Sequence, residues 1–422
     1  MWKRFLLMFC CSLVIFLCQA IYSNMAMSPL QLKTISTIDS NIRALRTGEL
    51  KVNVVDAQNN PIVGATVKLE QVRHNFEFGT VLNTEIFTNK FSQQDKDRYL
   101  AIAKQYFNAS VHENALKWYS TEPQRGRVSY APADTILNWS LSTKLKMRGH
   151  TLFWEDEKYN QPWLKSLGRD ELKRAVIGRA QEVCSRYRGR IDEFDVLNEM
   201  LHGNFFRSRL GNGIVKEMFD TCKRANPNAV LYVNDFNILN GRELDKYVQL
   251  IHSLLKQGVP IGGIGAQGHI RDKITPERIQ KSLDTLAQFK LPIKITEFDA
   301  VSDTEEDKAQ ILRNVYQVAF AHPAVQGILM WGFWESTHWK PKAALYNRNW
   351  QPLLAAQAYI DLVYDKWWTR VNTVTNDFGR VCIRGFFGDY RLLVSVRNQK
   401  NEQTFSFKPS NNNSKIIDVV IR

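Results

Sequence analysis

The sequence predicts an α/β fold, a (β/α)8 TIM barrel that carries a small β appendage. Between residues 76 and 364, eight short runs of apolar and β-branched residues alternate with longer amphipathic segments. This alternation is typical of a parallel sheet covered by helices, and eight units in about 290 residues fit a closed barrel. Both ends of the chain instead alternate apolar and polar residues one by one, as half-buried strands do.

The composition is that of a soluble globular chain, with 44% hydrophobic and 23% charged residues. These values exclude a collagenous, disordered or polytopic membrane protein. The formal net charge is +14, but Lys and Arg are scattered and never form a run of five. Nucleic acid is therefore not an expected partner. A basic surface is compatible with acidic polysaccharides, because it concentrates polymers of opposite charge.

The predicted barrel occupies residues 76–364. Its strands are expected at 76–82, 110–116, 147–153, 194–199, 230–236, 261–270, 293–299 and 325–333. Helices are expected between them, for example at 131–145, 170–187, 241–255 and 305–321. Reactive groups of such a barrel lie where its strands end, at the C-terminal face. The polar residues that end these runs are therefore the candidates for a site.

The appendage is predicted to combine residues 44–75 with residues 365–422. Leu50, Val52 and Val54 alternate with polar residues, and residues 381–383, 392–396 and 416–420 are further strand candidates. Isolated hairpins are marginal in water, so we expect both ends to share one β unit. Its aromatic residues leave two interpretations open, a carbohydrate-binding surface or packing against the barrel. They are Trp367, Trp368, Phe386, Phe387 and Tyr390.

The N-terminus has the form of a secretory signal peptide over residues 1–20. Lys3 and Arg4 precede an apolar run at 5–18, which is too short to span a membrane untilted. Cys18 and Ala20 suit cleavage after Ala20; an uncleaved signal anchor is the alternative. We therefore expect a protein secreted to the extracellular space or periplasm, with no membrane contact beyond the leader.

Three cysteines remain after the leader, namely Cys184, Cys222 and Cys382. They lack the C-x-x-C spacing of a zinc site. Buried free thiols are the favoured interpretation, and one disulfide with an odd cysteine left over is the alternative.

Two glutamates end predicted barrel strands. Glu199 closes the fourth run, and Glu297 closes the core of the seventh. Carboxylates at the tips of these strands can face each other across the barrel mouth, and about 5–5.5 Å between them is the geometry of a retaining glycosidase. In that chemistry one carboxyl stays protonated to assist the leaving oxygen, while the other stays ionised and attacks the anomeric carbon.

With these motifs, the chain resembles glycoside hydrolase family 10, the endo-β-1,4-xylanases, over roughly residues 107–354. Residues 195–199 (DVLNE) resemble the acid/base motif and residues 295–299 (ITEFD) the nucleophile motif. The resemblance implies that Glu199 is the general acid/base, Glu297 the nucleophile and Asn198 a ligand of the sugar 2-hydroxyl.

Further motifs in family order imply the substrate-binding residues. The third-strand motif (residues 149–154, GHTLFW), the second-strand pairs (EN at 113–114, KW at 117–118), the sixth-strand pair and two tryptophans of the cleft roof all match. The residues implied are Glu113, Asn114, Lys117, His150, Trp154, Asn198, Gln267, His269, Trp331 and Trp339. Flat rings suit the apolar faces of sugars, and the polar groups suit their hydroxyl edges. Trp118 is expected to add a further ring, and a core position is the alternative for each tryptophan and for both histidines.

Four places depart from the family pattern, and one of them is Ala115, which replaces a common Glu. Glu155 stands where the family usually has His, which resembles a plant-type branch, and its carboxylate is expected to raise the pKa of Glu199 or to take its proton. Phe236 stands where Tyr is usual, which removes one hydroxyl contact toward the leaving group. The segment at 334–336 replaces a more polar loop before Trp339.

The predicted function is therefore a retaining endo-β-1,4-xylanase that acts on xylan or xylo-oligosaccharides as a monomer, with no cofactor and no metal. The alternatives are another β-glycanase of the same clan, a xylan transglycosylase, or a non-catalytic xylan-binding wall protein. A binding protein has no need of a matched acid and nucleophile, so the two glutamates favour an enzyme.

Overall fold

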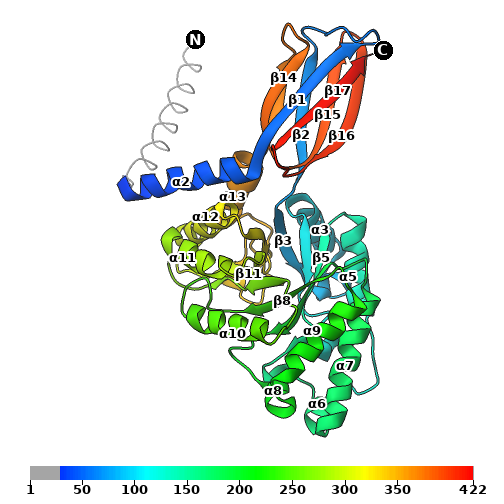
Figure 1. Cartoon of the computed structure of the whole chain (residues 1–422), viewed down its shortest axis with the longest axis vertical. Coiled ribbons are helices and arrows are strands. Elements are labelled where there is room, and N and C mark those ends of the chain that lie inside the picture. Colours follow the sequence, from blue (N-terminus) through cyan, green and yellow to red (C-terminus); the bar gives the residue numbers. More distant parts are fainter. Residues whose placement is uncertain (1–28, 422) are drawn as a thin grey trace, which may run out of the picture.

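A computed structural model describes residues 29–421 of the chain. Figure 1 shows a barrel surrounded by helices, with an elongated β sandwich at one end. The predicted fold class is thus confirmed, whereas the predicted leader lies outside the described residues. Within residues 29–421, no helix is both long enough and apolar enough to cross a membrane.

Eight parallel strands form the barrel, and the pairing of the last with the first closes it. Their bounds are β3 (Glu77–Leu82), β4 (Ala109–His112), β5 (Lys146–Gly149), β7 (Glu193–Asn198), β8 (Val230–Asp235), β9 (Gly263–Ala266), β11 (Ile293–Ala300) and β12 (Val325–Met330). Two short strands, β6 (Phe153–Trp154) and β10 (His269–Ile270), pair with β7 and β11 beyond the ends of β5 and β9. Every residue of β11 is buried, as expected for a strand covered on both faces.

Helices cover the outside of the barrel. They are α3 (Gln93–Tyr106), α4 (Trp118–Thr121), α5 (Ala131–Ser142), α6 (Pro162–Ser166), α7 (Arg169–Arg186), α8 (Phe205–Leu210), α9 (Gly213–Ala225), α10 (Leu244–Lys256), α11 (Pro276–Ala287), α12 (Glu305–Ala321) and α13 (Leu354–Ile360). Short 3-10 helices are η1 (Thr84–Phe87), η2 (Glu157–Tyr159) and η3 (Pro341–Ala343), and η4 (Asp361–Lys366) is a π-helix that continues α13. Local sequence sets their starts. At α12, the side chain of Thr304 accepts a hydrogen bond from the N–H of Asp307, and three acidic residues occupy the first turn.

Helix α2 (Pro29–Arg46) lies beside α12 on the outside of the barrel and is absent from our sequence predictions. Ile38 and Ile42 are buried against the barrel core. The Arg46 guanidinium donates to the carbonyls of Phe320 (2.8 Å) and His322 (2.7 Å) at the end of α12. Residues 44–46, predicted as the start of a β segment, are therefore the last residues of a helix.

The appendage is a sandwich of two sheets with the strand orders β14-β1-β17 and β13-β2-β15-β16. Its strands are β1 (Thr47–Asp56), β2 (Thr66–His74), β13 (Arg370–Val374), β14 (Arg380–Phe386), β15 (Gly388–Val396), β16 (Gln399–Phe407) and β17 (Ser414–Ile421). Strands β1 and β2 do not pair with each other, because each lies between strands from the C-terminal end. Leu50, Val52 and Leu392 are fully buried between the sheets. Strands β13 and β16 were not predicted, since both are edge strands with mostly polar, solvated residues.

The five aromatic residues considered for a carbohydrate-binding surface are buried or half-buried. Trp367 is 1% exposed and packs in the barrel core with Phe386 against it, whereas Phe387 and Tyr390 lie inside the sandwich. Trp368 is half-buried and contacts the rings of His74 and Tyr364. None of these five rings is a flat, exposed surface for a sugar.

A disulfide joins Cys184 of α7 to Cys222 of α9, and Cys382 is exposed and free. The favoured interpretation of buried free thiols is therefore wrong. The two cysteines are 38 residues apart in sequence, but α7 and α9 pack side by side and bring their Cα atoms within 5.3 Å. Sequence spacing alone does not reveal this helix neighbourhood.

Candidate active site

A cleft of about 570 Å³ opens at the C-terminal ends of the barrel strands. All twelve residues predicted for the site line it: Glu113, Asn114, Lys117, His150, Trp154, Asn198, Glu199, Gln267, His269, Glu297, Trp331 and Trp339. They come from six different strands or the loops that follow them. The closed barrel is therefore what brings together side chains almost 230 positions apart in sequence.

Glu297 lines the cleft, is almost completely buried and is held by three neighbours. Its Oε1 accepts a hydrogen bond from Asn234 Nδ2 (2.8 Å), and its Oε2 lies 3.3 Å from His269 Nε2. Its backbone N–H donates to the carbonyl of Gln267 (2.7 Å). The same Asn234 amide donates to Asn198 Oδ1 (3.0 Å), so it fixes Asn198 relative to Glu297.

Glu199 follows β7 in a left-handed backbone conformation, with φ 59°. Such a conformation is unfavourable for a residue with a side chain and persists where the surroundings enforce it. The Glu199 N–H donates to the carbonyl of Asn234 (2.9 Å), and the Glu199 carbonyl accepts from the N–H of His202 (3.1 Å). The Glu199 carboxylate accepts hydrogen bonds from Trp154 Nε1 (2.8 Å) and Gln267 Nε2 (3.0 Å).

The surroundings displace the pKa values of the two carboxyls in opposite directions. Burial raises the pKa of Glu199, and the negative charge of Glu297 raises it further, against the hydrogen bond from Gln267. Burial also acts to raise the pKa of Glu297, but the charges of His150, His269 and Lys117 outweigh it and lower that pKa below its usual value. One carboxyl thus tends to keep its proton while the other stays ionised, which is the division of labour that acid-assisted nucleophilic attack requires.

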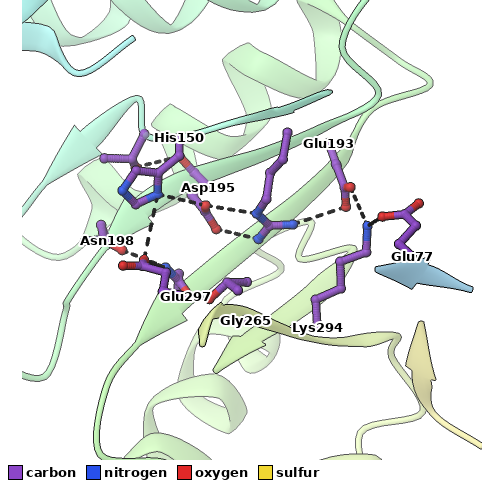
Figure 2. Close-up of polar contacts among 12 residues, drawn as sticks. Glu77, His150, Glu193, Asp195, Asn198, Gly265, Lys294 and Glu297 are labelled. Atoms are coloured by element: carbon purple, nitrogen blue, oxygen red, sulfur yellow. Dashed lines mark hydrogen bonds and ion pairs between the residues drawn. The ribbon is translucent and has the colours of Figure 1, made fainter. Parts of the chain in front are cut away.

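A line of polar contacts continues from Glu297 into the barrel (Figure 2). His150 Nδ1 lies 3.9 Å from Glu297 Oε1 and donates to Asp195 Oδ2 at 3.0 Å. Asp195 in turn accepts hydrogen bonds from the fully buried guanidinium of Arg148. His150 is 1% exposed, so it is a hydrogen-bonded core histidine that also faces the cleft.

The end of this line of contacts that is remote from the cleft consists of ion pairs. Arg148 donates to Glu193 (3.1 Å), and the buried ammonium of Lys294 bridges Glu193 and Glu77 (Figure 2). Layers of branched apolar side chains usually fill this part of such a barrel. Here, paired charges replace part of that filling at the end remote from the cleft.

One wall of the cleft is formed by the loop after β4 and by β6. It carries polar side chains and the indole ring of Trp154. The Lys117 ammonium donates to Asn114 Oδ1 (3.1 Å) and lies 4.6 Å from the centroid of the Trp154 ring. Burial lowers the pKa of Lys117, and the negative charges of Glu297 and Glu113 oppose this effect. Glu113 accepts a hydrogen bond from Asn83 Nδ2 (2.5 Å).

Two tryptophans of the cleft, Trp331 and Trp339, come from the segment after β12. Trp331 is 7% exposed and has its ring edge-on to His150. Trp339 is 48% exposed, and its indole N–H donates to Asp299 Oδ2 (2.7 Å). The Lys340 ammonium lies 4.0 Å from the Trp339 centroid and covers part of that ring.

Two sequence expectations about neighbouring residues are wrong. Glu155 turns away from the cleft: its carboxylate accepts from Arg207 Nε (2.7 Å) and from the N–H of Phe206 (2.9 Å). The raised pKa of Glu199 is caused by burial and by other carboxylates. Trp118 does not line the cleft, because it is buried against Phe206.

Residues that the sequence motifs do not indicate also line the cleft, above all His202, Tyr119 and Tyr159. His202 follows Glu199 by three positions. Its place just after the end of a barrel strand is the sequence feature that could have identified it as a cleft residue. Within residues 29–421, no group of three His, Cys, Asp or Glu side chains is placed to hold a metal ion. The expectation that the reaction needs no cofactor stays a prediction.

A cleft with two carboxyls of opposite protonation preference is the arrangement that most glycoside hydrolases use. Within that class, the family model for glycosyl hydrolase family 10 matches residues 68–362. The chain therefore belongs to this family.

Relatives and solved structures support this assignment. The anti-sigma-I factor RsgI6 of Acetivibrio thermocellus is 38% identical over 363 residues, which are 86% of this chain and 47% of that protein. Endo-1,4-beta-xylanase 1 of Arabidopsis thaliana is 33% identical over 366 residues, or 86% of this chain and 38% of that protein. The chain thus spans less than half the length of either relative. The likeness to plant members that Glu155 indicates is confirmed by the Arabidopsis xylanases.

Among solved structures, native xylanase 10B from Thermotoga maritima has 25% sequence identity and a TM-score of 0.64, and the match covers 69% of this chain and 96% of that one. Xylanase 10B from Thermotoga petrophila in complex with xylobiose has 26% identity and a TM-score of 0.64, with 69% and 95% covered.

Proposed function

We propose that this protein is a retaining endo-β-1,4-xylanase. The observation that carries the proposal is the pair Glu199 and Glu297, which line one cleft and have pKa values displaced in opposite directions. The similarity to named xylanases supports xylan or xylo-oligosaccharides as the substrate class.

In the proposed reaction, the ionised Glu297 attacks the anomeric carbon while Glu199 donates its proton to the glycosidic oxygen. A covalent glycosyl-enzyme forms and the aglycone leaves. Glu199, now ionised, then removes a proton from water, which attacks the same carbon and releases Glu297. Asn234 keeps Glu297 and Asn198 in register through both steps, because its amide donates to each of them.

The test follows new reducing ends during incubation of the purified protein with glucuronoxylan. Glu297→Ala and Glu199→Ala are each expected to lower kcat by roughly a thousandfold or more. Glu306→Ala, at an exposed position in the first turn of α12, is the matched control and is expected to keep wild-type activity. Equal activity of wild type and Glu297→Ala would remove the nucleophile assignment.

Stereochemistry separates retention from inversion. NMR of the first product should show the β-anomer, because two displacements restore the original configuration. Initial α-product would mean direct attack by water and would exclude a glycosyl-enzyme on Glu297.

Three further parts of the proposal have their own measurements. N-terminal sequencing of exported protein tests cleavage of the leader after residue 20. Light scattering tests the monomeric state. Expression of residues 76–364 without the sandwich tests whether that range is an independent barrel domain.

A further inference from the structure

His202 is a cleft residue whose orientation is fixed before any substrate arrives. Its Nδ1–H donates to Asp235 Oδ1 at 2.7 Å, and its ring stacks on Phe236 with centroids 3.6 Å apart and planes 16° apart. The side chain is 25% exposed, and its Nε2 has no hydrogen-bond partner within residues 29–421. One ring nitrogen is thus held by the protein while the other is left for a ligand.

Asp235, which holds His202, is itself rigid. The residue is fully buried, its Oδ2 accepts from the N–H of Leu201 (2.9 Å), and its Oδ1 also accepts from the N–H of Phe236 (3.0 Å). The turn from Glu199 to His202 is therefore clamped to the end of β8. A displacement of His202 would be transmitted to this turn, which also carries Glu199.

The position of His202 in the cleft indicates which part of a substrate it meets. Lys117 lies close enough to Glu297 to lower its pKa, so the wall containing Lys117 faces the sugar that Glu297 attacks. His202 and Phe236 line the same cleft from the loops after β7 and β8, whereas Lys117 lies in the loop after β4, and β5 separates β4 from β7 in the barrel order. A polysaccharide that crosses the cleft therefore places its departing sugar beside them.

The charges around His202 favour its protonated form. Burial lowers the pKa of His202, but the hydrogen bond to Asp235 and the negative charges of Asp235, Glu199 and Glu243 outweigh it, so the net pKa is raised. A protonated imidazole presents an Nε2–H donor, and hydrogen bonds from charged donors are stronger than neutral ones.

We propose that His202 is a positioning residue for the leaving-group sugar: its Nε2–H donates to a hydroxyl or ring oxygen of that sugar and aligns the glycosidic oxygen with Glu199. The inference rests on the proposed glycosidase function and adds a residue to it. A ring fixed by Asp235 and Phe236 loses little conformational freedom on binding, so most of the hydrogen-bond energy contributes to affinity and alignment.

The test compares two substrates that differ only in the departing group. Xylotetraose leaves a sugar on the His202 side, whereas a 4-nitrophenyl β-glycoside of xylobiose leaves a phenolate without hydroxyls. His202→Phe preserves a ring on Phe236 and removes both nitrogens. Its loss of kcat/KM on xylotetraose is expected to exceed its loss on the nitrophenyl glycoside by roughly tenfold or more, as for one charged hydrogen bond.

A conservative variant distinguishes loss of the hydrogen bond from misfolding, and a binding measurement tests the contact without requiring turnover. His202→Gln can still donate from its amide, so it should recover part of the loss on xylotetraose. In a Glu297→Ala background, calorimetry should show weaker binding of xylopentaose when His202→Phe is added. His252→Asn, on the exposed face of α10, is the control and should change neither measurement.

Equal losses on both substrates, or an unchanged Kd for xylopentaose, would overturn the proposal. The first result would mean that His202 acts through Glu199 rather than on the departing sugar. Failure of the xylanase proposal itself would look different, because the wild-type protein would then hydrolyse neither substrate, whereas failure of the His202 proposal alone leaves wild-type hydrolysis intact.

Discussion

Replacing Glu77 by glutamine should destabilise the fold by about 3 kcal/mol at pH 7. Glu77 begins β3 at the end of the barrel remote from the cleft, and its carboxylate contacts the ammonium groups of Lys294 and Lys146. Burial acts to raise the pKa of Glu77, but these two charges outweigh it and lower the pKa from 4.5 to about 2. At about 1.4 kcal/mol per tenfold change in the proton equilibrium, this lowering corresponds to about 3 kcal/mol.

The pH dependence of this effect has a definite sign. Because the folded-state pKa is depressed, the stabilisation by ionised Glu77 is complete above pH 4.5 and is lost as the pH falls toward 2. Glutamine imitates the protonated acid, so the difference in unfolding free energy between wild type and Glu77→Gln should shrink by more than half between pH 7 and pH 3.

Urea unfolding at several pH values measures this difference. Glu70→Gln is the control, because Glu70 pairs with Arg391 on the exposed face of the sandwich and its side chain is 44% exposed. We expect it to cost less than about 1 kcal/mol. A Glu77→Gln effect of the same size at pH 3 and pH 7 would refute the reasoning, since it would then reflect packing rather than charge.

Three further predictions follow from single contacts. Trp154→Phe removes the N–H that donates to Glu199, so it should raise the pKa of Glu199. In a pH profile of kcat/KM, the alkaline limb should then move to higher pH by roughly half to one pH unit. A shift of this limb to lower pH would contradict the prediction. Cys184→Ser opens the link to Cys222 across 38 residues and should cost up to about 4 kcal/mol in urea unfolding, whereas Cys382→Ser should cost almost nothing. Gly203→Ala places a Cβ 2.4 Å from a backbone carbonyl, so it should displace the turn behind Glu199 and lower kcat while leaving the sandwich folded; unchanged kcat would show that the turn can yield.

The barrel and its cleft could be read from the sequence because both depend on local patterns. A buried parallel strand is a short apolar run, and the two carboxyls stand near the C-terminal ends of such runs: Glu199 directly follows β7, and Glu297 lies in the second half of β11. The features that the sequence does not predict depend on which helices and loops pack against each other in the folded protein. Tertiary packing decides three such features: the burial of helix α2, the contact between α7 and α9, and the orientation of Glu155 toward Arg207. The spacing of residues along the sequence contains no information about these neighbours.

His202 shows the same limit within the site. The sequence places it near Glu199, but its stack on Phe236 and its bond to Asp235 exist only because β7 and β8 are adjacent in the closed barrel.

The pairing of the sandwich strands has a consequence for how the chain is made. Strand β1 pairs with β14 and β17, and strand β2 pairs with β13 and β15. Both strands therefore depend on partner strands that are synthesised some three hundred residues later. During that interval both edges of each strand are open, and open strand edges recruit other chains. Production of this protein is therefore expected to be most vulnerable to aggregation while the barrel emerges, and chaperones that shield extended segments should improve its yield more than those that enclose finished domains.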